Sequence, residues 1–204
     1  MKQMLKDMKM NSLISLLPKI IITAVLGVGG LLMGQEYPII LIIAAVMLLL
    51  MLWLLISSLS GTLQKKAKSF IANLNAAEQE KLVWDYQNAW KGSRTIRIGK
   101  DFTFVCDDGS RIYRNSEIIW VYAWYENGAH SGIGSSRHYY LNLYLIDKQE
   151  PEILGTTEKT YQNILKYYED NFSHIVVGQS DEASYLYRND RNQFLHLKYY
   201  SGQE

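Results

Sequence analysis

The sequence predicts an α+β chain: an N-terminal transmembrane helical hairpin, a helical connector, an antiparallel β domain closed by an amphipathic helix, and a C-terminal helix. Three observations predict this order. Residues 39–56 form an unbroken run of eighteen apolar side chains. After Gly92 the hydrophobic period changes from helical to alternating. A helical stripe with i, i+3, i+4 and i+7 spacing returns at 157–172. The expected boundaries are 1–60 for the anchor, 61–91 for the connector, 92–180 for the β domain and 181–204 for the terminal helix.

The run at 39–56 is read as a membrane span, because at about 1.5 Å per residue it covers most of a hydrocarbon layer roughly 30 Å thick. A second apolar stretch, 20–33, precedes it and reaches about 21 residues, enough for a span, when extended back to Leu13. Pro18 and Lys19 then fall inside, which is tolerable for a proline near a first turn and for a lysine that reaches the headgroups. A signal peptide is the alternative, but no small-x-small cleavage site follows.

The lysines predict the orientation of this hairpin. They lie outside both apolar segments, at Lys2, Lys6, Lys9, Lys65, Lys66 and Lys68, whereas the connection at 34–38 has no Lys or Arg. By the positive-inside rule both termini face the cytoplasm. We therefore expect a multi-pass protein of the cell (inner) membrane.

Small residues predict how the two spans pack. Gly27, Gly30 and Gly34 fall on about one face of the first segment, and Ala44 and Ala45 are the small residues of the second. Small residues let helix backbones approach closely in lipid. Packing within the hairpin is the main expectation, and a homodimer contact is the alternative. Neither segment has an ionisable residue near its centre, so an anchor is favoured over a transport path.

The connector is expected to hold two helices. Apolar residues recur at helical spacing from Thr62 to Leu74. Asn75 and Glu78 then have the spacing of a capping box, which predicts a second helix over about 76–89. Gly92-Ser93 ends it.

The β domain is predicted from alternation and turn residues. Asp107-Asp108-Gly109 is a hairpin signal, since Asp and Gly tolerate the positive φ of tight turns. The terminal helix begins near Asp181 and is expected to be interrupted at 189–192, where helix formers are scarce. The expected strands are 95–98, 102–106, 111–114, 117–125, 139–146 and 153–154, followed by a helix at 157–172 and an extended piece at 175–177.

Consecutive antiparallel strands followed by one amphipathic helix is the order of a pleckstrin-homology-like domain. The phrases NSEIIWVYAWYE, KYYEDNF and IVVGQSDE, after two membrane segments, resemble a family of small uncharacterised bacterial membrane proteins with a cytoplasmic pleckstrin-homology-like domain. The resemblance covers most of the chain and implies no activity or catalytic residue. Where a glycine-tyrosine pair is common before the terminal helix, this chain has Gly178-Gln179.

Composition excludes several classes. From Gly61 onward 17 Lys and Arg face 18 Asp and Glu, which gives no reason to expect nucleic acid as a partner. Cys106 is the one cysteine, so an intrachain disulfide is excluded, and its alternation with Phe102 and Phe104 predicts a buried apolar residue. Neither a cofactor nor a metal is expected, since no nucleotide, hydrolase or zinc motif occurs and the histidines lack metal-ligand spacing.

A loop at 127–137 and a nearby basic group are the candidate binding residues. The loop is rich in Gly and Ser, and its amides and hydroxyls, with Ser135, Ser136 and Arg137, are suited to an anion such as a lipid phosphate. An unadorned hairpin tip is the alternative. Arg94, Arg97 and Lys100 resemble the basic residues of lipid-binding pleckstrin-homology domains.

These features predict a membrane-anchored cytoplasmic binding or scaffolding module rather than an enzyme. Its partners would be the lipid bilayer and either a protein or an anionic lipid headgroup; the oligomeric state stays open. An inner-leaflet anionic-lipid sensor is the first alternative. The second is an enzyme with a site assembled from distant residues around His130 and His138.

Overall fold

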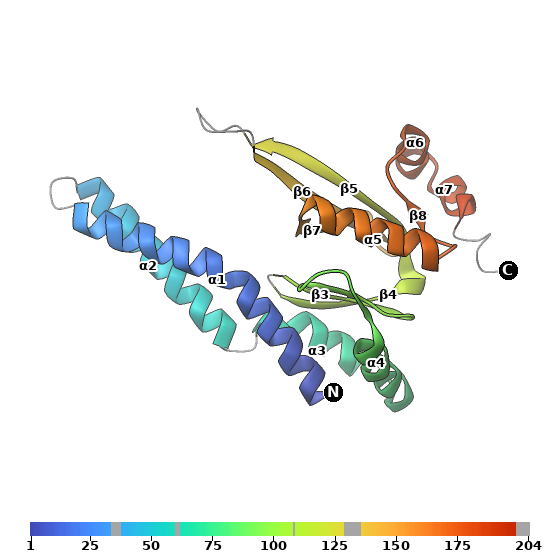
Figure 1. Cartoon of the computed structure of the whole chain (residues 1–204), viewed down its shortest axis with the longest axis horizontal. Coiled ribbons are helices and arrows are strands. Elements are labelled where there is room, and N and C mark those ends of the chain that lie inside the picture. The colour runs from blue at the N-terminus through green and yellow to red at the C-terminus, as the bar shows by residue number, and fades with distance from the viewer. Residues whose placement is uncertain (34–37, 60–61, 108, 129–135, 199–204) are drawn as a thin grey trace. The chain divides into compact units, whose positions relative to one another are not determined.

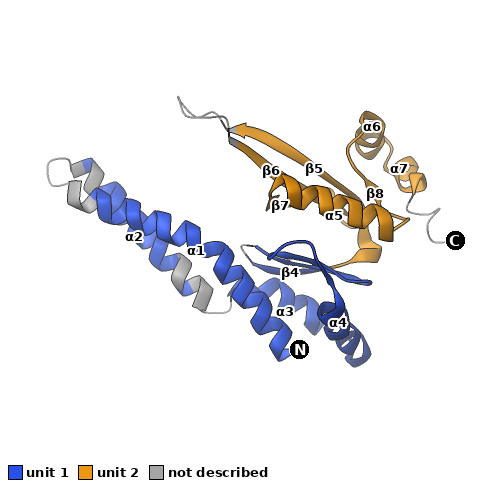
Figure 2. Ribbon diagram, in the orientation of Figure 1, with its two compact units in different colours: residues 1–112 blue, residues 113–204 orange. Residues whose placement is uncertain are grey.

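The structure, a computed structural model, describes residues 1–33, 38–59, 62–107, 109–128 and 136–198. The chain divides into two compact units, 1–112 and 113–204 (Figure 2). The division falls within β4, inside the segment that the sequence analysis treats as one β domain. Both units contain helices and a sheet, with the helices and strands largely in separate runs along the chain, which confirms the α+β class.

Unit 1 contains four helices, one short 3-10 helix and one sheet (Figure 1). The elements are α1 (Lys2–Met33), α2 (Pro38–Leu59), η1 (Thr62–Gln64), α3 (Lys65–Ala72), α4 (Ala76–Asn88), β1 (Trp90–Lys91), β2 (Ile96–Ile98), β3 (Phe102–Cys106) and β4 (Ser110–Arg114). The strands pair in the order β1-β2-β3-β4.

Helix α1 starts eleven residues before Leu13, where the sequence analysis begins the first apolar segment, and it contains Pro18 in its interior rather than in its first turn. The reason is a second stripe. Met4, Met8, Ser12 and Leu16 recur every four residues and are all buried, so they lie on one face of the helix. The first half of α1 therefore forms part of the core of unit 1.

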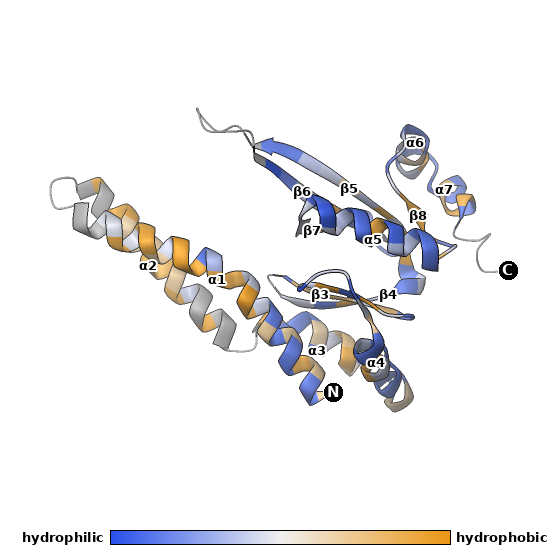
Figure 3. Ribbon diagram, in the orientation of Figure 1, coloured by the Kyte–Doolittle hydropathy of each residue, from blue (hydrophilic) through white to orange (hydrophobic). Residues whose placement is uncertain are grey.

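The second half of α1 has the opposite character. Its Ile21, Ile22, Val25 and Leu26 are all more than half exposed, and the hydropathy colouring of Figure 3 changes along the helix accordingly. Among the residues that the structure describes, one helix is long and apolar enough to cross a membrane, the Lys2–Gly30 part of α1. The described part of α2 contributes a shorter apolar stretch, Ile42–Trp53.

The core of unit 1 lies between the first half of α1, helices α3 and α4, and one face of the sheet. Tyr86 meets Phe104 edge to face at 5.1 Å, and Phe70 meets Phe102 at 6.1 Å. The capping box that the sequence predicts at the start of α4 is present, with Asn75 and Glu78 each accepting the other's backbone amide. The buried cluster comprises Met4, Met8, Ala67, Ile71, Leu74, Leu82, Tyr86, Ala89, Phe102, Phe104, Cys106 and Ile112.

Unit 2 is one sheet with helices packed on both of its faces. Its elements are η2 (Asn115–Glu117), β5 (Ile118–Gly128), β6 (Ser136–Leu145), β7 (Glu152–Thr156), α5 (Glu158–Asn171), β8 (Val176–Val177), α6 (Asp181–Asn189) and α7 (Arg191–Leu197). The strand order is β7-β6-β5-β8, antiparallel except for the parallel pair of β5 and β8. The break between α6 and α7 at Asp190 confirms the predicted interruption.

The helices of unit 2 cover different parts of its sheet. Helix α5 packs on β5 and β6 through the fully buried Ile164 and Tyr168. Helices α6 and α7 pack on the base of β5 and β6, where Phe194 and Leu186 join Trp120 and Tyr144 in one cluster. Strands β5 and β6 continue past this covered region, and both are longer than the sequence predicts.

Candidate functional site

The outer ends of β5 and β6 form the candidate site. We call this segment the aromatic arm, defined as residues 122–128 of β5 and 136–142 of β6. In Figure 1 the two strands run side by side beyond α5, α6 and α7. An element that leaves the cover of its own helices exposes side chains and backbone to a partner, and binding residues concentrate at such places.

Opposed aromatic pairs, one stacked and one tilted, join the two strands of the arm. The register places Trp124 opposite Tyr140 and Tyr125 opposite Tyr139. The rings of Trp124 and Tyr140 stack at 4.8 Å with an interplanar angle of 25°. Directly opposed aromatic pairs each contribute roughly 0.2–1 kcal/mol to an antiparallel sheet, so they stabilise the pairing of the two strands here.

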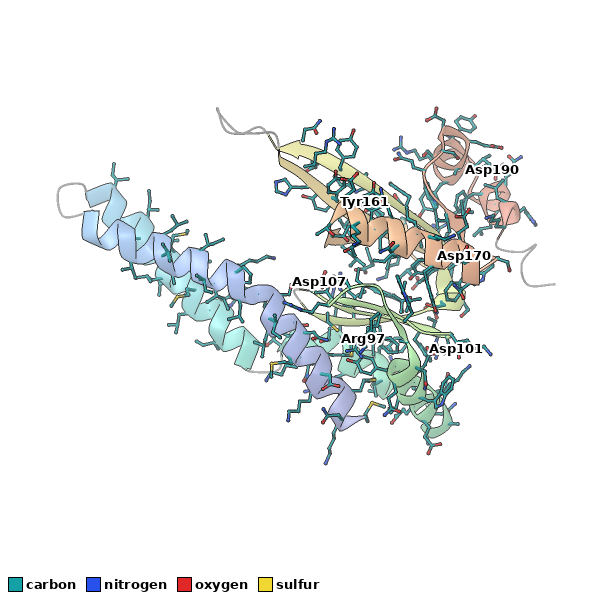
Figure 4. All side chains as sticks on the ribbon, viewed as in Figure 1. Arg97, Asp101, Asp107, Tyr161, Asp170 and Asp190 are labelled. Atoms are coloured by element: carbon teal, nitrogen blue, oxygen red, sulfur yellow. The ribbon has the colours of Figure 1, made fainter. Side chains whose placement is uncertain are left out.

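The two faces of the arm carry different chemistry. On one face the Trp124 indole donates to the Asn142 amide oxygen at 3.2 Å, beside the stacked Tyr140. On the other face Tyr139 packs against Tyr161 of α5, which is labelled in Figure 4, and donates to Glu158 at 2.8 Å. Arg137 lies over the Tyr125 ring at 5.0 Å.

Two titratable groups of the arm are held in their ordinary charge states. A hydrogen bond to Glu158 raises the pKa of Tyr139, because the carboxylate accepts a hydrogen bond that only the protonated phenol can donate. A hydrogen bond to Tyr139 raises the pKa of Arg137. The arm therefore presents a neutral phenol and a guanidinium, which are binding groups rather than a proton-transfer pair.

The outer edge of β5 is the second feature of the arm. Strand β8 pairs with β5 at Trp120 and Val121, and the Gly178 amide donates to the Val121 carbonyl at 2.9 Å. Beyond Val121, no described residue forms a backbone hydrogen bond with this edge. Among the described residues, this edge therefore has unpaired backbone donors and acceptors next to the half-exposed Tyr125 ring.

The base of the arm is fixed by polar contacts from the C-terminal helices. The Trp120 indole donates to the Gly178 carbonyl at 2.8 Å, and the Tyr122 and Tyr144 hydroxyls lie 3.1 Å apart. Arg191 of α7 donates to the carbonyls of Leu145, Ile146 and Lys148 at 2.8–3.2 Å. These contacts fix the base of the arm, because they tie β5 to the residue after β8 and the end of β6 to α7.

The residues predicted to bind an anion fall into two groups in different units. Arg94 and Lys100 are exposed in unit 1. Arg97, labelled in Figure 4, stacks over the Tyr86 ring at 4.5 Å and closes the edge of the core. In unit 2, Ser136 and the exposed Arg137 begin β6, whereas Ser135 and residues 129–134 of the predicted loop lie outside the described residues.

The turn between β2 and β3 already contains an anion from the protein itself. The carboxylate of Asp85, which is 1% exposed, accepts hydrogen bonds from the amides of Lys100, Asp101 and Phe102 at 2.7–3.0 Å. These amides are the donors that a phosphate would need at this turn. The sequence analysis does not identify this role of Asp85, because its partners follow 15–17 residues later in the chain.

The residues predicted to pack the membrane helices are placed as follows. Gly27 is buried against α2, and a Cβ added there would lie 3.0 Å from the Leu48 side chain and 3.6 Å from the Ala44 carbonyl. Ala44 is 2% exposed. Gly30 is half-buried and Ala45 is exposed, while Gly34 lies outside the described residues.

The described residues contain no group of three or more His, Cys, Asp or Glu side chains placed to hold a metal ion. His138 is exposed on the arm, and the His174 ring nitrogen lies 3.0 Å from the Asn115 carbonyl. His130 is outside the part of the chain that the structure describes. Cys106 is buried, and burial raises the pKa of its thiol to about 12.

Unit 1 carries a shallow cavity of about 520 Å³ on the outer side of α4. Its wall is mostly apolar and amide, with Trp84 58% exposed. The lining residues are Met1, Ala76, Gln79, Glu80, Val83, Trp84 and Gln87. The sequence signal for it is an apolar pair, Val83-Trp84, next to the buried stripe of α4.

A family model described as Domain of unknown function (DUF6709) matches residues 61–187. The match covers the connector, both sheets and most of α6. No curated protein and no solved structure matches the chain.

Proposed function

The chain belongs to the DUF6709 family, and from that premise we propose that it is a membrane-anchored binding module, with α1 and α2 as a transmembrane hairpin and the aromatic arm as the binding surface. Both termini would face the cytoplasm. We include in the proposal a pleckstrin-homology-like domain, which the element order supports: four strands, then three, then the amphipathic helix α5.

The observation that carries the anchor is the two-part character of α1. Its first half packs Met4 and Met8 into the core of unit 1, and its second half exposes apolar side chains to the surroundings. One continuous helix therefore belongs to both a water-soluble core and a hydrophobic medium. Large contiguous apolar surfaces of this kind are rare on soluble monomers, and lipid is the medium that accommodates them.

The return path of the chain supports two crossings. Helix α2 packs against α1 along the apolar half. After α2 the chain re-enters the same core, where the Gln64 side chain donates to the Leu5 carbonyl. The segment before the first apolar half and the segment after the second thus lie together, which supports two crossings rather than one. Lys65, Lys66 and Lys68 in this region support a cytoplasmic location.

The binding role is supported by the exposed chemistry of the arm. Trp and Tyr rings supply contact area at low conformational cost, and they are enriched where proteins bind partners. Tethering adds to this, because confinement at the bilayer raises the effective concentration and lets a small contact suffice. Anionic lipid is supported less well as the ligand, since Asp85 already occupies the amides beside Arg97 and Lys100.

The test uses the full chain, because a 92–204 fragment would lose Met4, Met8, Leu82 and Tyr86 from the core of unit 1. We expect the protein to pellet with membranes after a carbonate wash. Chemical cross-linking in these membranes, before solubilisation, should then capture a defined polypeptide partner, and Trp124→Ala should reduce that recovery by tenfold or more. The control is Trp84→Ala, which removes an indole from α4; Trp84 is 58% exposed, whereas Trp124 is half-buried. Equal recovery with both variants would contradict a binding role for the arm.

A further inference from the structure

The outer edge of β5 offers a strand-pairing surface. Backbone groups of alternate residues in a strand point to the same side. Because the Val121 carbonyl accepts from Gly178 on the outer side, the N–H and C=O of Ala123, Tyr125 and Asn127 also point outward. The groups of Trp124 and Glu126 point inward to β6, where these residues pair with Tyr140 and His138.

This edge lacks the usual protection against strand addition. Natural edge strands carry lysines, prolines or bulges, or are covered by other elements. Residues 122–128 contain no Lys, Arg or Pro, and Glu126 is their one charge. The bulge of β5 lies at its base, between Ile118 and Trp120. Tyr125 is 50% exposed.

The small size of the edge indicates which partner it fits. Seven residues span about 24 Å of strand, whereas a standard stable interface uses roughly 20–30 residues on each side. A freely diffusing partner would not remain bound through this contact alone. A second copy anchored in the same bilayer would, because tethering supplies a high effective concentration.

We propose that two copies of the chain pair through their β5 edges, antiparallel and about a two-fold axis at Tyr125. This inference rests on the proposed membrane anchor. In this arrangement the four-stranded sheet of unit 2 in one copy continues into the same sheet of the second copy.

The two-fold axis is placed at Tyr125 because of the backbone groups that point outward from the edge. It places Tyr125 opposite its counterpart and Ala123 opposite Asn127 of the second copy, which engages all three outward residues in about six backbone hydrogen bonds. Trp124 then faces Glu126 of the other copy, so no like charges are opposed. A centre at Glu126 would place two carboxylates directly opposite each other, which is destabilising.

The experiment is disulfide cross-linking of the full chain in isolated membranes. The native Cys106 is buried with a raised pKa, so introduced cysteines report alone. Tyr125→Cys should form a disulfide-linked dimer at least tenfold more efficiently than Ile153→Cys. Ile153 is a matched control, because it is also 50% exposed and lies on the other edge strand, β7.

The register has its own test. Asn127→Cys alone should not cross-link, since two Asn127 positions would be about 14 Å apart and disulfides need Cα atoms within about 7 Å. Ala123→Cys alone should fail for the same reason. Co-expression of Ala123→Cys and Asn127→Cys in separate copies should give the dimer. Adding Tyr125→Pro to both copies should abolish it, because proline removes an outward N–H without removing a bond to β6.

Each result is decisive. If the carbonate-washed membranes lack the protein, the anchor of the proposed function fails. If the protein is in the membranes and Tyr125→Cys links no better than Ile153→Cys, the anchor stands and the pairing is wrong. A linked product of another mass at Tyr125→Cys would also overturn the pairing, since a different polypeptide would then occupy the edge.

Discussion

Replacing Asp85 should strongly lower the free energy of unfolding of unit 1. Its buried carboxylate accepts three backbone amides across the turn between β2 and β3. Hydrogen bonds to a charged group are each worth about 1.5–3 kcal/mol, and orphaned donors add to the loss. We expect Asp85→Ala to lower the free energy of unfolding by about 4 kcal/mol or more, measured by chemical denaturation of the solubilised full chain.

The control for this variant is Asp101→Ala. Asp101 forms an ion pair with Lys81 at 2.8 Å, and the lysine side chain is 56% exposed. Exposed ion pairs contribute about 0–1 kcal/mol, so this variant should remain close to the parent. Equal losses for the two variants would contradict the role assigned to Asp85.

Gly99 is required by the same carboxylate. A Cβ at this position would lie 2.2–2.5 Å from the carboxylate atoms of Asp85, closer than real atoms approach. Gly99→Ala should therefore destabilise the protein, and the double variant with Asp85→Ala should lose less than the sum of the two single losses, as expected for residues in contact. Additive losses in a double-mutant cycle would refute the direct contact.

Alkaline pH should destabilise unit 1 through two buried groups. Burial raises the pKa of Cys106 from 9.0 to about 12 and that of Tyr86 from 10.0 to about 12. For a group whose pKa is raised by folding, the stability is fully present below the unfolded pKa and is lost as the pH rises through the folded pKa. We expect the free energy of unfolding to fall between about pH 9 and pH 12. Cys106→Ala should make this fall shallower, and an unchanged slope would contradict the assignment.

At the level of residues, local chemistry is what the sequence makes visible. The Asn75 and Glu78 capping box is readable because its partners are three positions apart, and the alternation around Cys106 correctly predicts burial. The role of Asp85 is not readable, since it depends on a turn that is distant in sequence. The sequence suggests that Arg97 is a surface cation, but its guanidinium packs on the Tyr86 ring.

Among the elements, α1 is the one whose two halves serve different environments. Met8 is fully buried in the core of unit 1, while Met10 on the same helix is 50% exposed. Truncating a buried methionine to alanine costs about 2–5 kcal/mol. Met8→Ala should therefore destabilise unit 1 by that amount, detected as faster proteolysis of residues 62–112 in membranes.

Met10→Ala is the matched control, with an expected change within about 0.5 kcal/mol. If Met8→Ala left protease resistance unchanged, the first half of α1 would not be part of the core. The proposal that one helix joins the domain to the membrane would then fail as well.

Element positions are largely predictable here because the period of the hydrophobic pattern changes clearly from helix to strand. The start of α1 is not predictable, because its buried stripe (Met4, Met8, Ser12 and Leu16) includes a serine and has lysines between its members. The stripe can be recognised as a core face only when the elements that pack against it are known. The length of β5 and β6 also exceeds the prediction. Polar residues such as Glu126 and His138 end the apolar alternation, yet the pairing continues past them to Gly128 and Ser136.

In the whole molecule, unit 1 unites three segments that the sequence analysis assigns to three parts of the chain: the anchor, the connector and the first strands. Sequence patterns show each segment's own period, but long-range packing decides which segments share a core. The exposed edge of β5 is likewise a property of the assembled sheet. It exists because β8 has only two residues to pair with a strand of eleven.

The most direct measurement of the central claim, a hairpin that leaves and re-enters one core, is labelling of single cysteines by a membrane-impermeant maleimide in intact cells and in inverted vesicles. The positions are Met10→Cys, Lys68→Cys and Gln35→Cys, with buried Cys106 as an unreactive background. The account expects Met10→Cys and Lys68→Cys to label together from the cytoplasmic side, and Gln35→Cys to label from the opposite side. Labelling of Met10→Cys and Lys68→Cys from opposite sides would contradict it.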